Sequence, residues 1–308
     1  MRQLTEQFCD VGGGVTLCYE RFGNASDPPM LLIMGLATQM IGWPDEFCAA
    51  LARRGFQVIR FDNRDIGRST RIKGRPPTPR QLITRKIDPV LYTLADMAGD
   101  AAGLLRELGL APAHVVGASM GGMIAQTLAA EHPESVRSLV SVMSTTGNRW
   151  RGQPSFAIYR YLLRQAPEDR EAFIEYTTTM FEAIGSRGLP FDRDRVRDMV
   201  ARSYDRGRDP ASPGRQLAAI LASGDRTRQL RTIRSPTLVI HGSKDKMVAK
   251  SGALATARAI PGARLMIIDG MGHDLPEAAW PQLVEAISGH ADAADQGAPA
   301  QRAPLRAS

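Results

Sequence analysis

Short apolar runs alternate with stretches of helical spacing along most of this chain. The run at residues 30–34 is continuous, which is typical of a strand buried on both faces of a sheet, and residues 57–61 and 237–240 are also predicted to be strands. Apolar positions at helical spacing occur between them, at residues 47–52 and 94–108. Further strands are predicted at residues 15–22, 114–116, 136–143 and 264–268. We therefore predict an α/β fold with a mostly parallel central sheet and helices on both of its faces.

The alternation stops in the middle of the chain. Residues 147–230 contain no convincing buried strand and instead show helical patterns rich in arginine and aromatic residues. Such an interruption predicts a helical cap, inserted after the sixth strand, over a core made of residues 1–146 and 231–290. Residues 291–308 are rich in Ala, Gln, Pro and Arg, which predicts a disordered tail.

Ser119 is the strongest candidate for a catalytic residue. It lies in Gly117-Ala118-Ser119-Met120-Gly121, between an apolar β-branched run and a helix-compatible run. A serine between two glycines at a strand-to-helix turn is the layout of a nucleophile elbow, which holds the hydroxyl above the sheet at a helix N-terminus. The alternative is an ordinary glycine-rich turn whose serine caps the helix.

A serine nucleophile needs a base, and five histidines are available. His273 is the best candidate because it follows the last apolar strand in the glycine-containing loop 269–273, C-terminal to Ser119. His241 ends the preceding strand and is the main competitor. His114 would point into the core from the strand before Ser119.

The base in turn needs an orienting acid between Ser119 and His273 in the chain. Asp245 directly follows the penultimate strand, at the sheet edge where ligands bind in such folds. Asp269 and Asp274 compete, but both are too close to His273 on one loop, and Asp225 falls within the predicted cap.

Acyl transfer also needs donors for an oxyanion, for which the backbone N–H groups of Met120 and Leu36 are predicted; Gly35 lets the second loop turn. Apolar side chains of the two loops and of the cap are predicted to line the substrate pocket: Met34, Met40, Met123, Phe156, Tyr159 and Phe181.

Composition narrows the function classes. The 308 residues carry a net charge of +7, but basic and acidic residues are interleaved and only 6% of residues are aromatic, which argues against nucleic-acid binding. The three cysteines, Cys9, Cys18 and Cys48, are irregularly spaced and adjoin no motif, which favours inert thiols in a reducing compartment.

The N-terminus lacks the apolar core of a signal peptide and no run could span a bilayer, so we expect a soluble cytoplasmic protein. The sequence does not decide between a monomer and a homodimer.

Four segments together resemble the α/β-hydrolase superfamily, over residues 15–288. They are Met34-Gly35-Leu36, the stretch 62–69, the stretch 117–122, and His241-Gly242-Ser243-Lys244-Asp245 with Gly272-His273. The stretches 34–36, 42–47 and 60–62 are similar to the aclacinomycin methylesterase branch. Many relatives carry histidine where this chain has Met34. The resemblance implies the α/β-hydrolase fold and a structural role for Asp62 and Arg64.

Residues and resemblance together predict a serine hydrolase of the carboxylesterase type. It would act on neutral, largely apolar small-molecule esters through an acyl-enzyme on Ser119, and it would need no metal or organic cofactor. Enol-lactone hydrolysis, carbon–carbon bond hydrolysis and peroxyacid formation use a similar triad and stay open. A hydrolase-fold ligand receptor is the non-enzymatic alternative.

Overall fold

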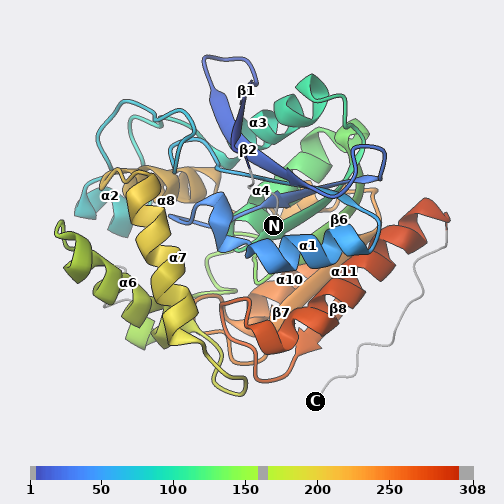
Figure 1. Cartoon of the computed structure of the whole chain (residues 1–308). Coiled ribbons are helices and arrows are strands. Elements are labelled where there is room, and N and C mark those ends of the chain that lie inside the picture. The colour runs from blue at the N-terminus through green and yellow to red at the C-terminus, as the bar shows by residue number, and fades with distance from the viewer. Residues whose placement is uncertain (1–4, 159–165, 298–308) are drawn as a thin grey trace.

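A computed structural model describes residues 5–158 and 166–297 of the chain. Its centre is an eight-stranded sheet with strand order β1-β2-β4-β3-β5-β6-β7-β8 (Figure 1). The strands β3 to β8 are parallel, whereas β2 runs antiparallel to both β1 and β4. The strand bounds are β1 Gln7–Asp10, β2 Thr16–Phe22, β3 Pro29–Ile33, β4 Gln57–Phe61, β5 Ala113–Ala118, β6 Val136–Val142, β7 Thr237–Gly242 and β8 Arg264–Ile268.

Helices cover both faces of this sheet. One face packs against α3, α4 and α10, and the other packs against α1 and α11. No helix in the described residues is long and apolar enough to cross a bilayer. The helix bounds are α1 Asp45–Arg53, α2 Pro79–Thr84, α3 Leu94–Glu107, α4 Met120–Glu131, α6 Arg170–Ile184, α7 Arg193–Arg206, α8 Ser212–Ser223, α9 Thr227–Leu230, α10 Lys250–Ala259 and α11 Trp280–Asp295, with short 3₁₀ turns at Met40–Gly42, Pro133–Ser135 and Glu277–Ala279.

The continuous apolar runs serve two hydrophobic cores at once. In β3, Leu31 and Ile33 belong to the core under α3 and α4, whereas Met30 and Leu32 belong to the core under α1 and α11. Successive side chains of a strand point to opposite faces, so a central strand needs an apolar residue at every position. The predicted fold class is therefore confirmed.

The ends of the chain differ from the sequence-based prediction. The strand β1 was not predicted, because its four residues are mostly exposed and show no apolar run. The prediction of a disordered tail from residue 291 was wrong at its start, because α11 continues to Asp295 and buries Ala291 at its inner face. The residues from 298 onward lie outside the described part of the chain.

The predicted insertion lies between β6 and β7. Its described helices are α6 to α9, of which α6, α7 and α8 gather at one end of the molecule, at the left of Figure 1. We call residues 147–230 the insertion.

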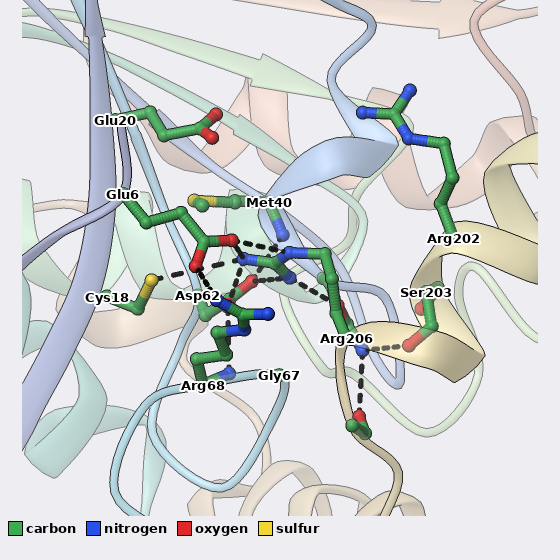
Figure 2. Close-up of polar contacts among 12 residues, drawn as sticks. Glu6, Cys18, Glu20, Met40, Asp62, Gly67, Arg68, Arg202, Ser203 and Arg206 are labelled. Atoms are coloured by element: carbon green, nitrogen blue, oxygen red, sulfur yellow. Dashed lines mark hydrogen bonds and ion pairs between the residues drawn. The ribbon is translucent and has the colours of Figure 1, made fainter. Parts of the chain in front are cut away.

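Two arginines, Arg206 and the buried Arg215, bind the insertion to the loop that follows β4. Arg206, at the end of α7, lies 3.0 Å from Asp62 and 2.8 Å from Glu6, and Figure 2 shows its guanidinium between these carboxylates. Arg215 of α8 forms a bidentate pair with Asp65, at 2.6 and 2.7 Å. Because the side chains of Asp62 and Asp65 have no exposed surface, each depends on an arginine of the insertion for its countercharge.

Candidate active site

The turn between β5 and α4 holds Ser119 in a conformation that most residues avoid. Its φ is +56° and its ψ is −118°, and its N–H donates to Val142 at the end of β6. Gly121 packs directly against the backbone of Ile33, where a Cβ atom would collide. The glycine therefore permits the close approach, and the turn lifts the Ser119 hydroxyl at the start of α4.

Three predicted residues come together at this turn. The Nε2 atom of His273 lies 2.9 Å from the Oγ of Ser119, and its Nδ1 atom lies 2.8 Å from the Oδ2 of Asp245. The three residues follow β5, β7 and β8, whose carboxyl ends meet at one edge of the sheet. This is the arrangement of a nucleophile, a base and an orienting acid.

Backbone N–H groups of the loop after β7 hold the Asp245 carboxylate in place. Its side chain is fully buried, and its second oxygen accepts the backbone N–H groups of Met247 and Val248 at 2.9 and 2.8 Å. The same bonds fix the plane of the carboxylate that faces His273.

The competing residues have other partners. His241 is fully buried with Nε2 at 2.8 Å from the Val248 carbonyl, and burial lowers its pKa. Asp269 accepts the Ser243 hydroxyl at 2.7 Å, and Asp274 accepts that of Ser186 at 2.6 Å. Asp225 binds Asn148 and Thr227 within and beside the insertion. None of these four contacts the Ser119 hydroxyl in the described residues.

The two predicted oxyanion donors lie on either side of Ser119. Gly35 packs against the Cβ of Ser119, so the loop after β3 approaches Ser119 with no side chain between them. The N–H of the following Leu36 and the N–H of Met120 donate to no acceptor among the described residues. Both are therefore available to a ligand oxygen.

Side chains that the sequence did not single out hold this loop. Asn63 donates to the Met34 carbonyl at 2.8 Å, and Gln216 of α8 accepts the N–H of Ala37 at 2.9 Å. Ala37 has a φ of +57°, an uncommon conformation for a residue with a side chain. The insertion thus supports the loop that carries Leu36.

Arg226 is a further residue that the sequence did not single out. It is completely buried, and it donates to the carbonyls of Met123 in α4 and Thr145 after β6, at 2.8 and 2.7 Å. Burial lowers its pKa to about 10. It thus joins α4 to the segment just before the insertion.

The predicted pocket residues have mixed outcomes. Met34 and Met123 are buried in the cores beside the two loops, and Phe181 is half-buried on α6. Phe156 is 93% exposed, so its assignment to the pocket was wrong; Ile158 is the buried residue of that stretch.

Met40 and Tyr159 are the two remaining residues that were predicted to line the substrate pocket. Met40 packs in a separate cluster with Cys18 and Ile41, beside Asp62 in Figure 2. Tyr159 lies outside the described residues.

Over the described ranges, no group of three His, Cys, Asp or Glu side chains could hold a metal ion.

Comparisons with known proteins identify the family of this chain. The family described as the alpha/beta hydrolase fold matches residues 28–277. The chain is 31% identical to a rhodomycin D methylesterase of Streptomyces peucetius and 32% identical to that of Streptomyces sp. strain C5, each match covering 91% of this chain and 96% of the relative. A hydrolase structure from Pseudomonas aeruginosa PA01 superposes with a TM-score of 0.67 at 25% identity, covering 96% of this chain and 99% of that one. The resemblance stated from the sequence motifs is confirmed, and the chain belongs to the α/β-hydrolase family.

Proposed function

We propose that this chain is a serine carboxylesterase that hydrolyses neutral, largely apolar esters, with methyl esters among them. The hydrogen-bonded series Ser119–His273–Asp245, at 2.9 and 2.8 Å, carries the proposal. Identity of 31% and 32% to two methylesterases supports the ester class.

The geometry supports a two-step reaction. His273 Nε2 accepts the proton of Ser119 as the hydroxyl oxygen attacks the ester carbonyl, and the N–H groups of Leu36 and Met120 stabilise the oxyanion. Asp245 keeps the Nδ1 proton on His273 and stabilises the imidazolium ion. His273 then gives its proton to the leaving alcohol and activates a water molecule that cleaves the acyl-enzyme. The reaction needs no metal or organic cofactor.

The charges near the site favour a neutral substrate. Three arginines of the insertion already bind protein oxygens: Arg206 and Arg215 bind aspartates, and Arg226 binds carbonyls. Met34 and Met123, buried beside the two loops, are adaptable apolar side chains. Beside these described side chains, an anionic acyl group would lose its hydration, and the three arginines are already engaged. The insertion arginines Arg160 and Arg164 lie outside the described residues.

The test combines an active-site probe with a substrate panel. We expect a fluorophosphonate to label Ser119, and kcat/KM to be higher for neutral methyl and short-chain esters than for matched anionic esters and enol-lactones. Labelling without turnover of any substrate would favour the ligand receptor. Preference for the anionic member of each pair would overturn the neutral-ester proposal and favour the enol-lactonase alternative.

Thiol alkylation provides an independent check. We expect iodoacetamide at neutral pH to leave ester hydrolysis largely intact, because burial raises the pKa values of Cys18 and Cys48 to about 12 and keeps both thiols protonated. Cys9 is half-buried in β1, far along the sheet order from the strands that carry the site. The measurement is residual activity against the extent of labelling by mass spectrometry. Inactivation that a bound substrate prevents would instead place a cysteine in the pocket.

A further inference from the structure

The loop that carries His273 is bonded to the insertion on both sides of the histidine. The N–H of His273 donates to the Ile184 carbonyl at 2.9 Å. The N–H of Gly272 donates to the Ser186 hydroxyl at 2.9 Å, and that hydroxyl donates to Asp274 at 2.6 Å. Residues 184 and 186 stand at and just beyond the end of α6, so the insertion supplies a partner to three consecutive residues of the loop.

The two segments also approach each other closely along the backbone. The N–H groups of Arg187 and Gly188 lie 3.3 and 3.1 Å from the carbonyl oxygen of Gly270 and donate to it. A Cβ atom on Gly188 would lie 2.5 Å from the Cα of Gly270. No side chain fits between the segments here, so a displacement of one backbone must displace the other.

Ser186 lies at the centre of this contact. It is 6% exposed, and its hydroxyl accepts one hydrogen bond from Gly272 while it donates another to Asp274. Burial raises the pKa of Asp274, and the hydrogen bond from Ser186 opposes that rise. Removal of the hydroxyl would leave a buried N–H and a buried carboxyl group without this partner.

We propose that Ser186 is a positioning residue for His273, through which the insertion sets the place of the catalytic base. This inference rests on the proposed ester hydrolysis. A shift of the imidazole by a fraction of an ångström would lengthen the 2.9 Å contact to Ser119 and slow the proton transfer. Substrate binding, which involves other residues, would be affected far less.

The test uses Ser186→Ala in the full chain. We expect kcat for a neutral methyl ester to fall about 10- to 100-fold while KM changes little. The downfield proton resonance between His273 Nδ1 and Asp245 is expected to weaken or shift. Ser186→Thr keeps the hydroxyl and is expected to restore most of kcat.

Ser223→Ala is the matched control. Its hydroxyl also joins the insertion to the core, accepting the N–H of Leu94 at 2.9 Å, but it bonds to α3 and not to the His273 loop. Its kcat should equal that of the unmodified protein. Equal losses in Ser186→Ala and Ser223→Ala, or a loss that follows only a lower melting temperature, would overturn the positioning role.

Ser119→Ala, assayed in parallel, separates the two proposals. If it is inactive while Ser186→Ala keeps full kcat, only the positioning role fails. If Ser119→Ala keeps its activity, the proposed function itself fails.

Discussion

Replacement of Ser119 by alanine is expected to abolish ester hydrolysis while the fold survives. The hydroxyl is the proposed covalent partner of the acyl group, so only binding and the oxyanion donors would remain. We expect kcat to fall by roughly 10⁴- to 10⁶-fold, as when a triad serine is removed from other enzymes. The measurement is steady-state hydrolysis of a neutral methyl ester, together with thermal unfolding.

The folded state of this variant should be at least as stable as that of the original chain. The hydroxyl of Ser119 bonds only within the site and supports no core element, so its removal costs the fold little. The positive φ of this position is as unfavourable for alanine as it is for serine. Retention of most of the activity, with an unchanged melting curve, would remove Ser119 from the mechanism.

Asp245→Asn is expected to have the next largest effect. An amide at this position can present its NH₂ group to His273 Nδ1 and so favour the wrong tautomer, with Nε2 protonated and unable to accept the Ser119 proton. By analogy with the corresponding change in a serine protease, kcat should fall roughly 10⁴-fold. The assay is the same ester hydrolysis, with fluorophosphonate labelling as a second readout.

Asp269→Asn is the control for this change. Asp269 also follows a strand of the sheet, but its carboxylate lies at the surface on the Ser243 hydroxyl. Its replacement should leave kcat near the original value, and Asp274→Asn should have an effect well below that of Asp245→Asn. A larger loss in either of these two variants than in Asp245→Asn would reassign the acid.

Much of the fold could be predicted from the sequence because the central strands need apolar residues on both faces. The run that became β3 has no polar position, and no helix or turn explains such a run as simply. The elements at the margins lack this signal. Strand β1 is exposed, and the last turns of α11 are stabilised by Ala291 in a stretch of low complexity.

The members of the site were predictable for a similar reason. Ser119, Asp245 and His273 each lie in the turn or loop after a strand, and chain order restricts the choice of partners. The residues that hold the site in place were not predictable. Ser186 and Gln216 make their contacts across intervals of 86 and 179 residues, and no local pattern encodes a contact over such an interval.

The residues that line the substrate pocket were also hard to predict from local sequence. Phe156 and Ile158 are both apolar and two positions apart, so helical spacing alone does not decide which one faces inward. The structure buries Ile158 and leaves Phe156 at the surface. Tertiary contacts decide the orientation of a short insertion segment that composition describes only as apolar.

The pairs Arg206–Asp62 and Arg215–Asp65 also bear on how this protein could be recombined with its relatives. Each pair has one member in the insertion and one in the core, and both aspartates are fully buried. A foreign insertion without an arginine at each place would leave a buried carboxylate without its countercharge. Each broken pair would lower the free energy of unfolding by about 3–5 kcal/mol. The insertion is therefore not a portable module: a chimera that is to remain folded must inherit both arginines or lose both aspartates.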